Sequence, residues 1–319
     1  MKKYDVVALG ELLIDFINNG ISAQGNPLFE ANPGGAVCNV LAMLNKLGHK
    51  TAFIGKVGED IFGHQLKKVL DEIDIDTAGL LMDKEVRTTL AFVANDETGE
   101  RSFSFYRNPG ADMMLRADEV SEEAIRSARM FHFGTLSMTH ELVREATKRA
   151  LDMAKENGLL ISFDPNLRES LWDTLENAKT QVDYGLHYCD VLKISDNEIQ
   201  WFTGEEDFDK GIKILQDKYH VPLILLSMGK EGSRAYYKDL RVEVPGFIQE
   251  KTIETTGAGD TFFGSCLHFV LEKGLEDLKE SDLKEMLKFA NAAASIITTR
   301  KGALKVMPAE EEVRSLTEK

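Results

Sequence analysis

The segment Glu254–Phe262, with the sequence Glu-Thr-Thr-Gly-Ala-Gly-Asp-Thr-Phe, is the strongest candidate for chemistry, and it leads directly into an apolar stretch with helical spacing. Glycines at 257 and 259 allow a tight turn that exposes backbone N–H groups, and at the beginning of a helix such groups favour an anion. Asp260 follows at once. A carboxylate beside a phosphate site suits a general base that takes the proton from an attacking hydroxyl group. The alternative is a glycine turn with a helix-capping aspartate.

A second glycine motif, Pro33–Asn39, opens another helical pattern. Gly34 and Gly35 allow a ligand to approach the backbone closely, and Asn39 offers both a donor and an acceptor. Asp15 follows the first predicted strand, where its carboxylate is suited to accept two hydroxyl hydrogen bonds. Such groups recognise polyols, whereas the alternative interpretation is a turn followed by a helix cap.

Three further loops carry polar groups near the ends of predicted strands. Arg168, in Asp164–Arg168, has the fork that binds a phosphate or a carboxylate with two hydrogen bonds. Arg107, at the end of a predicted hairpin, is placed to point at a substrate, although a solvated charge is the simpler explanation. Ser227–Gly232 follows the most apolar strand and resembles a nucleotide-contacting loop, but glycine loops like it are common.

Composition and missing motifs exclude several classes of protein. The chain has 319 residues, 38 Lys and Arg against 53 Asp and Glu, and a net charge of −15, which argues against nucleic acid as a partner. The longest apolar run, Val221–Met228, is far shorter than the roughly 20 residues of a membrane span, so no membrane partner is expected. The sequence contains no P-loop, no dinucleotide-binding glycine motif after the first strand and no nucleophile elbow.

The cysteines and histidines indicate neither disulfides nor a zinc site. Cys38, Cys189 and Cys266 are far apart in the sequence, which predicts reduced thiols in a cytoplasmic protein. The seven histidines show no His-Glu-x-x-His motif and no paired spacing of zinc ligands, so no zinc is expected.

Strand and helix patterns alternate along most of the chain. The predicted strands are Val6–Leu9, Thr51–Ile54, Met130–Phe133, Leu159–Phe163, Val191–Ile194, Val221–Ser227, Arg234–Tyr237 and Val242–Val244. The predicted helices are Val37–Leu47, Ile61–Ile73, His140–Asn157, Leu175–Tyr188, Asp207–Tyr219, Gly259–Lys273 and Leu283–Thr299. Such alternation predicts an α/β fold with a mostly parallel central sheet flanked by helices.

Two β-rich stretches, at about 14–30 and 86–108, interrupt this alternation. The second is typical of a hairpin with the polar turn Asn95–Glu100. We expect both stretches to form one small sheet over the carboxyl ends of the main strands, where open α/β sheets bind ligands. A small sheet at that edge would act as a lid that excludes water. The whole chain, 1–319, is then a single domain with a lid.

The order of these motifs resembles the ribokinase-like (PfkB-type) carbohydrate kinases over essentially the whole chain. The resemblance rests on two specific signatures: Gly-Gly-x-x-x-Asn at 34–39 with Gly55–Gly63, and Thr-Gly-Ala-Gly-Asp at 256–260. Within the family, four stretches are most similar to fructokinases: Gly10–Phe16, Phe105–Met113, Asp164–Trp172 and Lys193–Ser195.

The resemblance implies transfer of the γ-phosphoryl group of ATP, with Mg²⁺, to a sugar hydroxymethyl group, most closely fructose to fructose 6-phosphate. It implies that Asp260 is the base and that the backbone N–H groups of Gly257, Ala258 and Gly259 form the anion hole. The implied sugar-binding residues are Asp15, Gly34, Gly35, Asn39, Arg107 and Asp260. The implied ATP-binding residues are Arg168, Lys193, Ser195, Ser227, Gly229, Gly232, Gly259 and Asn291.

The resemblance also implies two metal sites, each with a departure from the family pattern. The Asn-x-x-Glu motif tied to Mg²⁺ reads Ser195-Asp196-Asn197-Glu198 here, so Glu198 would act through a water molecule and Ser195 replaces the asparagine. Many members have Asp at a monovalent-cation site where this chain has Glu254, which is one methylene longer. The other ligands implied for K⁺ are Thr256 and the carbonyl groups of Ile297, Arg300 and Gly302.

Several alternatives stay open. A 2-keto-3-deoxygluconate kinase shares the aromatic–Arg pair at the lid, and its arginines serve a substrate carboxylate, so the role of Arg107 is ambiguous. A catalytically inactive sugar-binding protein on this fold would not need Asp260, and a dehydrogenase would need the missing glycine fingerprint. Exposed edges of the lid need cover, which leads us to expect a homodimer that packs lid to lid.

Overall fold

The computed structural model describes residues 2–95 and 101–318. The strands of the main sheet are β1 (Tyr4–Leu9), β4 (Thr51–Gly58), β5 (Ile75–Asp83), β8 (Ala128–Gly134), β9 (Leu160–Asp164), β10 (Val191–Ser195), β11 (Leu223–Ser227), β12 (Ser233–Tyr237) and β13 (Leu240–Val244). Their spatial order is β13-β12-β11-β10-β9-β8-β1-β4-β5. Neighbours from β11 to β5 are parallel, and β12 and β13 form an antiparallel edge. The predicted mostly parallel sheet is therefore confirmed.

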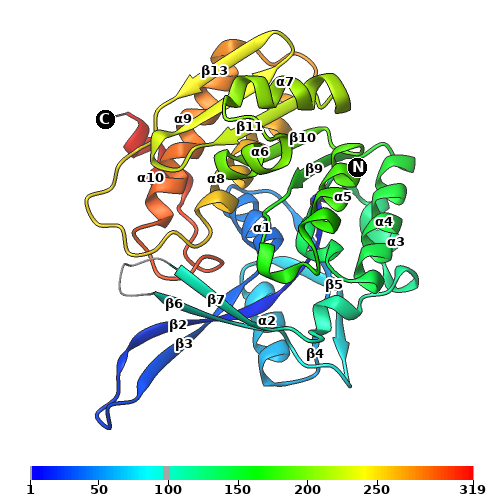
Figure 1. The fold of residues 1–319 in the computed structure, drawn as a ribbon, viewed down its shortest axis with the longest axis vertical. Helices are drawn as coiled ribbons and strands as arrows, with labels where there is room; N and C mark the ends of the chain where they lie inside the picture. Colours follow the sequence, from blue (N-terminus) through cyan, green and yellow to red (C-terminus); the bar gives the residue numbers. More distant parts are fainter. Residues whose placement is uncertain (1, 96–100, 319) are drawn as a thin grey trace.

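Helices cover both faces of this sheet (Figure 1). One face carries α1 (Ala36–Lys46), α2 (Ile61–Glu72), α8 (Ala258–Lys273) and α9 (Glu280–Ile297), with α10 (Glu310–Thr317) packed on α9. The other face carries α3 (Glu122–Arg126), α4 (Glu141–Glu156), α5 (Leu175–Leu186), α6 (Asp196–Thr203) and α7 (Phe208–Tyr219).

The central strand β1 shows how the sequence requires both layers. Val6 and Ala8 lie in the core under α1 and α8, whereas Val7 and Leu9 lie in the core under α3 and α4. Successive residues of a strand point to opposite faces, so a continuous apolar run leaves no face for water.

Several elements do not follow from the sequence patterns. β5 lies at the edge of the sheet and is largely half-buried, so it lacks a continuous apolar run. α6 has eight residues and α10 buries only Val313, so neither has a strong apolar stripe. Short 3₁₀ helices lie at Ala111–Met114, Ala117–Glu119, Thr135–Met138, Glu169–Leu171 and Gly229–Glu231.

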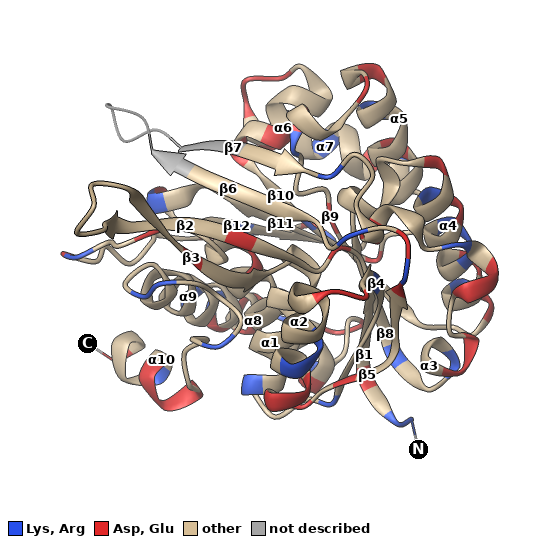
Figure 2. Ribbon diagram, turned by 90° about the horizontal axis from the view of Figure 1, so that it is seen from below, with Lys and Arg blue, Asp and Glu red and all other residues tan. Residues whose placement is uncertain are grey.

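The small sheet has the order β3-β2-β6-β7. Its strands are β2 (Leu13–Ile21), β3 (Pro27–Gly34), β6 (Leu90–Asn95) and β7 (Arg101–Tyr106). β2 pairs with β3 antiparallel and with β6 parallel, so strands from two distant stretches form one sheet. Residues 96–100 of the expected hairpin turn lie outside the described residues. Figure 2 shows few charged residues on this sheet, whereas acidic and basic residues are mixed over the outer helices.

Within residues 2–95 and 101–318, no helix combines the length and the apolar character needed to cross a membrane.

Candidate active site

The carboxyl ends of the parallel strands bring the polar groups of the site together. Glu11 follows β1, Thr135 follows β8, and Asp164, Ser195 and Ser227 are the last residues of β9, β10 and β11. Two cavities lie at this edge, with volumes of about 290 Å³ and 430 Å³. We call the first the lid cavity and the second the loop cavity.

The lid cavity lies between the small sheet and the main sheet. Leu13 and Asp15 from β2, Val93 from β6 and Phe105 from β7 line one side. The other lining residues belong to the main domain: Glu11, Gly35, Ala36, Asn39, Leu136, Asn166, Arg168, Lys193, Thr255, Thr256, Gly257, Gly259 and Asp260. The structure thus gathers most of the predicted sugar-site and phosphate-site residues from distant parts of the sequence.

Glycine is needed at 34 and 35 for different reasons. A Cβ at Gly34 would collide with the Asp15 carboxylate, and a Cβ at Gly35 would collide with the carbonyl oxygen of Glu11. Gly35 also has a φ of 139°, a conformation that L side chains rarely adopt. Gly34 does not line the lid cavity but lies directly behind Asp15.

Asp260 lies in the first turn of α8 and is almost fully buried at the wall of the lid cavity. Its Oδ2 accepts a hydrogen bond of 2.7 Å from Asn39 Nδ2. Burial raises the pKa of Asp260, and the Asn39 hydrogen bond together with the charges of Lys193 and Arg168 opposes the shift. A carboxylate with a raised pKa is a stronger proton acceptor at neutral pH.

The backbone at 257–259 begins α8 in the way that an anion site requires. Gly257 caps the helix with a φ of 74°, and a Cβ there would lie 2.7 Å from Ala303 Cβ. A Cβ at Gly259 would lie 3.4 Å from Lys193 Nζ, so the ammonium group is close to this turn. First-turn N–H groups and the helix dipole favour an anion, and Lys193 adds a full charge. The N–H of Ala258, however, donates to the Thr255 carbonyl at 3.2 Å, so it is already engaged.

A buried network holds the Asp164–Arg168 loop next to β10. Lys193 Nζ lies 3.1 Å and 3.0 Å from the two carboxylate oxygens of Asp164. Burial lowers the pKa of Lys193, but the carboxylates of Asp164 and Glu198 outweigh it and raise the pKa overall. Glu198 accepts 2.8 Å hydrogen bonds from the N–H groups of Leu167 and Ser195, and a 2.9 Å bond from the Ser195 hydroxyl. Glu198 is therefore a support of this loop and lines neither cavity.

The loop cavity contains the predicted nucleotide-loop residues Ser227, Gly229, Gly232 and Asn291. It also contains Lys230 of the same loop and four residues of the 254–262 motif, Thr255, Ala258, Gly259 and Phe262, of which Gly259 was an implied ATP-binding residue. The sequence motifs did not indicate its remaining lining residues: Gly246, Phe247, Ile248, Gln249, Thr252, Ala294, Ser295 and Thr298. The available signal for this wall was the apolar pair Phe247–Ile248 in a loop. In the structure the Ile248 side chain is 84% exposed.

The two cavities meet immediately before the candidate base. Thr255 and Gly259 line both of them. Asp260, the next residue, lines the lid cavity alone. Ligands in the two cavities would therefore lie next to each other at the turn that begins α8.

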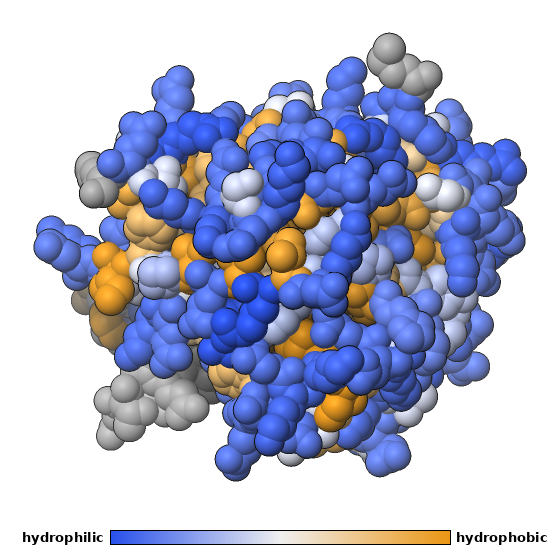
Figure 3. Space-filling view, turned by 90° about the horizontal axis from the view of Figure 1, so that it is seen from above, coloured by the Kyte–Doolittle hydropathy of each residue, from blue (hydrophilic) through white to orange (hydrophobic). Residues whose placement is uncertain are grey.

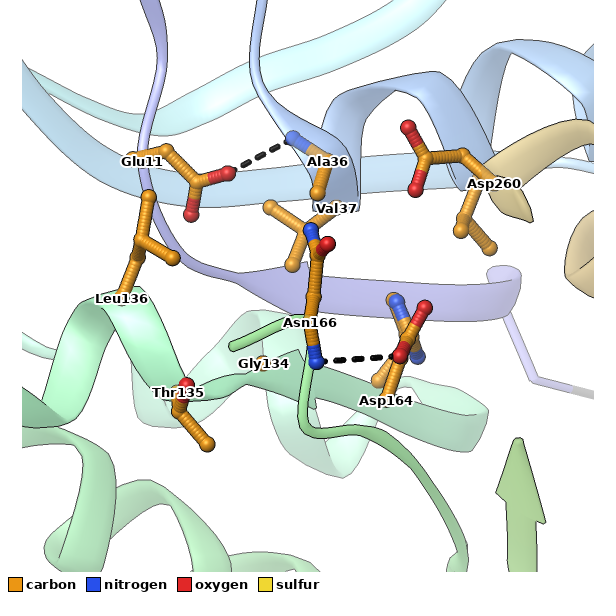
Figure 4. A pocket seen from close by; sticks show the side chains of 11 residues that line it. Glu11, Ala36, Val37, Gly134, Thr135, Leu136, Asp164, Asn166 and Asp260 are labelled. Carbon is orange, nitrogen blue, oxygen red and sulfur yellow. Dashed lines mark hydrogen bonds between the residues drawn. The ribbon is translucent and has the colours of Figure 1, made fainter. Parts of the chain in front are cut away.

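Glu11 and Asn166 are site residues to which the sequence analysis assigned no role. Both line the lid cavity and a smaller cavity of about 10 Å³ beside it, where Figure 4 shows them with Asp164 and Asp260. Glu11 Oε1 accepts a 2.6 Å hydrogen bond from the N–H of Ala36. The available signal for Glu11 was an acid directly after the first buried strand.

Three carboxylates thus share one cavity. Burial raises the pKa of Glu11 to about 7. Burial and the charges of Glu254 and Asp260 raise the pKa of Asp15 to about 7, although Arg168 opposes the shift. Such a cavity is rich in hydrogen-bond acceptors, which suits a neutral polyol better than an anion.

Arg107 does not lie where the sequence analysis expected a sugar-binding residue. Its Nε donates to Asp112 at 2.8 Å, Nη1 donates to Thr139 Oγ1 at 2.8 Å, and Nη2 donates to the Leu136 carbonyl at 3.0 Å. Arg107 is buried and is not among the residues that line the two cavities. The physical reason is Asp112, a buried carboxylate five residues on, which pairs with the guanidinium inside the protein.

The segments expected at a cation site lie together. Glu254 is buried, and its Oε1 accepts a 2.9 Å hydrogen bond from the N–H of Gly302. The N–H of Ile253 donates to the Thr298 carbonyl at 2.8 Å. The carbonyl of Ile297 accepts from the N–H of Arg300 at 3.0 Å. Glu254 therefore faces the 297–302 turn that carries the implied carbonyl ligands.

Comparisons with known proteins point to one family over nearly the whole chain. The model of the pfkB family carbohydrate kinases matches residues 3–310. Probable fructokinase-2 of Arabidopsis thaliana is 42% identical over 312 residues, which are 97% of this chain and 94% of that protein. The crystal structure of fructokinase with bound ATP from Xylella fastidiosa superposes with a TM-score of 0.90 and 31% identity, over 100% of this chain and 99% of that chain. Fructokinase from Vibrio cholerae O395, in its fructose, ADP and calcium ion bound form, has a TM-score of 0.86 and 30% identity over 98% of both chains.

Proposed function

The chain belongs to the pfkB family of carbohydrate kinases, and from this premise we propose that it transfers the γ-phosphoryl group of ATP to the hydroxymethyl group of fructose, which yields fructose 6-phosphate. It is a phosphotransferase with an alcohol group as acceptor. The observation that carries the proposal is the meeting of the lid and loop cavities at 255–259, directly before Asp260. An acceptor in the first cavity and ATP in the second would face each other across this turn.

In the proposed mechanism Asp260 takes the proton of the attacking hydroxyl group. Asn39 holds the carboxylate through its Nδ2–H hydrogen bond. The backbone N–H groups of Gly257 and Gly259 and the Lys193 ammonium stabilise the negative charge on the transferred group, whereas the N–H of Ala258 is bonded to Thr255. The small sheet covers the lid cavity and so keeps water away from the acceptor hydroxyl group.

The remaining site residues divide between the two cavities. Asp15 accepts hydrogen bonds from the sugar hydroxyl groups, and Asn39 donates or accepts them. Gly34 and Gly35 keep the backbone close to the sugar. Arg168 lies in the lid cavity with Asp260, where it suits a phosphate group. The proposed nucleotide contacts in the loop cavity are Ser227, Gly229, Gly232 and Asn291.

Two cations belong to the proposal. Mg²⁺ supplies positive charge that neutralises the phosphate oxygens. Glu198 fits it only through a water molecule, because three hydrogen bonds already occupy most of the roughly four lone-pair positions of a carboxylate. K⁺ would be held by Glu254, Thr256 and the carbonyl groups of Ile297, Arg300 and Gly302, which lie on facing segments.

Fructose is favoured over 2-keto-3-deoxygluconate by the charge of the lid cavity. Glu11, Asp15 and Asp260 would repel a substrate carboxylate, against the attraction of Arg168 and of Lys193, which is paired with Asp164. Arg107, the residue that made the two acceptors hard to distinguish, pairs with Asp112 instead of reaching the cavity. Curated relatives at 42% and 41% identity are fructokinases.

A homodimer completes the proposal. Asp15, Val93 and Phe105 face the lid cavity, so Phe16, Phe92 and Tyr106 point to the opposite face of the small sheet. Their rings form a chain of contacts, with Phe16–Phe92 centroids 4.8 Å apart and Phe92–Tyr106 centroids 5.3 Å apart. A second copy packed on this face would remove the aromatic surface from water.

A cytoplasmic location is proposed from the cysteines. Cys38, Cys189 and Cys266 are all buried and unpaired, as expected in a reducing compartment.

The direct test is ADP release with MgATP across several acceptors: fructose, 2-keto-3-deoxygluconate, ribose, glucose, mannose and adenosine, each with and without K⁺. We expect turnover with fructose to exceed that with every other acceptor. Preference for the keto-deoxy acid would refute the charge argument. No turnover with any acceptor would favour a catalytically inactive sugar-binding protein.

A further inference from the structure

Away from both cavities, two histidines from distant parts of the chain face each other. His49 lies between α1 and β4, and His268 lies in α8. His49 Nε2 is 2.8 Å from His268 Nδ1. Glu272 follows His268 by one helical turn, and the ligand atoms of all three residues lie within 4.8 Å of one another.

The spacing of these atoms is close to that of a tetrahedral metal site. Zinc–nitrogen distances of about 2.0–2.1 Å place two ligands of a tetrahedron about 3.3 Å apart. The two imidazoles therefore need to separate by only about 0.5 Å to hold an ion between them. His268 and Glu272 are four residues apart on one helix, so their side chains lie on the same face.

A carboxylate, itself held by hydrogen bonds, lies behind one ring of the histidine pair. Asp5 Oδ2 lies 3.7 Å from Nδ1 of His49, the ring nitrogen that does not face His268. Asp5 is itself held by the N–H of Lys50 and by Arg129, each at 3.0 Å. A carboxylate behind a histidine fixes the orientation of the ring and makes it a better ligand. His49 is buried, whereas Glu272 is exposed, so an ion could enter from solvent.

We propose that His49, His268 and Glu272 bind one divalent transition-metal ion, with Zn²⁺ as the expected ion. Two imidazoles and one carboxylate form a donor set that suits Zn²⁺ and Co²⁺ and suits Mg²⁺ poorly. Histidine spacing in the sequence led us to expect no zinc, and this proposal differs from that expectation. The spacing did not reveal the pair because the two histidines are 219 positions apart.

The ion would connect α8 to the beginning of β4, at the edge of the sheet opposite the active site. Asp260 and His268 lie on the same helix, but they are about 12 Å apart along its axis at 1.5 Å per residue. The bound ion therefore stabilises the fold and takes no part in phosphoryl transfer.

Cobalt titration tests the site directly. The full chain is freed of metal with a chelator, kept free of nucleotide, and titrated with Co²⁺ alone while the visible absorption of tetrahedral Co²⁺ is followed. We expect one ion per chain, displaced by Zn²⁺. Glu272→Gln, at an exposed position that tolerates substitution, should lower the Co²⁺ affinity by at least about tenfold. His64→Gln, an exposed histidine of α2, is the control and should bind as the wild type does.

Thermal unfolding gives a second readout. Zn²⁺ should raise the Tm of the wild type and of His64→Gln, and it should leave the Tm of Glu272→Gln and His268→Gln unchanged. Equal Co²⁺ affinity in the wild type and Glu272→Gln would overturn the proposal. So would a wild-type Tm that does not respond to Zn²⁺, since the histidines would then share only a hydrogen bond.

Discussion

Buried carboxylates give the lid cavity its acid–base character. The pKa values of Glu11 and Asp15 are each raised to about 7, and that of Asp260 is raised as well. In water such groups lose their protons near pH 4. Desolvation disfavours the charged form, and for Asp15 the neighbouring carboxylates add to the effect. Glu11 and Asp15 should therefore titrate near pH 7, and the pKa of Asp260 should lie above its usual value.

The first prediction concerns this titration. We expect kcat/KM for fructose to fall as the pH drops below about 7. The activity falls on the acid side because each carboxyl group carries a proton below its folded-state pKa. The protonated group is a weaker acceptor of hydroxyl hydrogen bonds and of the substrate proton. The measurement is a pH–rate profile at saturating MgATP. Asp15→Asn should lower kcat/KM and make the acid limb less steep, whereas a wild-type profile that stays flat down to about pH 5 would argue against the raised pKa values.

Gly257→Ala is the second prediction. The φ of 74° at Gly257 strains any L side chain, and the added Cβ would press on Ala303. We expect a loss of about 1–2 kcal/mol in the free energy of unfolding from the backbone strain. Movement of the first turn of α8 should also lower kcat by at least about tenfold.

Gly204→Ala is the matched control for this change. Gly204 has a φ of 77° and open space around its Cβ position, and it ends α6 far from both cavities. Denaturant unfolding should show a similar loss of stability, while kcat stays at the wild-type value. Equal kcat values for the two variants would contradict the role of the 257–259 turn.

Among the secondary-structure elements, Asp60 links α2 to the small sheet. Asp60 Oδ1 accepts hydrogen bonds from the N–H groups of Phe62 and Gly63, at 3.0 Å and 2.8 Å, and so caps α2. Its Oδ2 accepts a 2.8 Å bond from the N–H of Thr88, which precedes β6. One carboxylate thus fixes both a helix beginning and the strand that enters the lid.

The third prediction is that Asp60→Ala loosens the lid. It should cost about 1–3 kcal/mol of stability, because a helix cap and a partly buried hydrogen bond to the Thr88 backbone are lost together. It should also raise KM for fructose more than KM for ATP. Backbone hydrogen bonds outweigh burial and lower the pKa of Asp60, so its stabilising contribution holds above its unfolded pKa and is lost as the pH falls through its folded pKa.

Asp207→Ala distinguishes an effect on the lid from a general loss of stability. Asp207 caps α7 by accepting bonds from the N–H groups of Asp209 and Lys210, at 2.9 Å and 3.2 Å, and it lies on the other side of the main sheet. Steady-state kinetics should show an unchanged KM for fructose in this variant. An equal rise of KM in both variants would mean that lost stability alone explains the effect.

At the scale of the whole molecule, the small sheet carries a group of exposed apolar side chains. Ile21, Leu28, Phe29 and Tyr106 of the small sheet are exposed. On the face shown in Figure 3, by contrast, hydrophilic side chains predominate and apolar surface appears in small separate areas. An aromatic sheet face of this kind is typical of an interface.

The fourth prediction is a homodimer through this face. Sedimentation equilibrium should give twice the chain mass, and Phe29→Asp should shift the equilibrium to the monomer because it would bury a charge. Ile214→Asp is the control: Ile214 on α7 is 41% exposed, close to the 42% of Phe29, and lies away from the lid. A monomer mass that does not change with wild-type concentration would remove the proposal.

Much of the fold could be predicted because strand and helix periods leave a clear pattern when both faces of a sheet are buried. The strands from β8 to β11 and the long helices α8 and α9 illustrate this. β5 and α10 could not be predicted, because β5 lies at the sheet edge and α10 packs mainly on α9. Weak apolar stripes carry little signal in a single sequence.

In the site, too, some residues could be predicted from the sequence and others could not. Asp260 and the glycines around it were recognisable because a turn, a helix beginning and an acid occur together in the sequence. The pairing of Arg107 with Asp112 could not be predicted, because it depends on how a 3₁₀ helix folds back under the lid. The 246–252 wall of the loop cavity consists of irregular backbone, for which no periodic pattern exists.

The central claim is that Asp260 removes the proton of the acceptor at the junction of the two cavities, and Asp260→Asn tests it most directly. The amide keeps the shape of the side chain but accepts no proton. Calorimetric binding of fructose and ATP should stay within a few-fold of the wild type, and kcat should fall by about 10²–10⁴-fold. A kcat near the wild-type value, or a loss confined to fructose binding, would mean that Asp260 is a ligand and not the base.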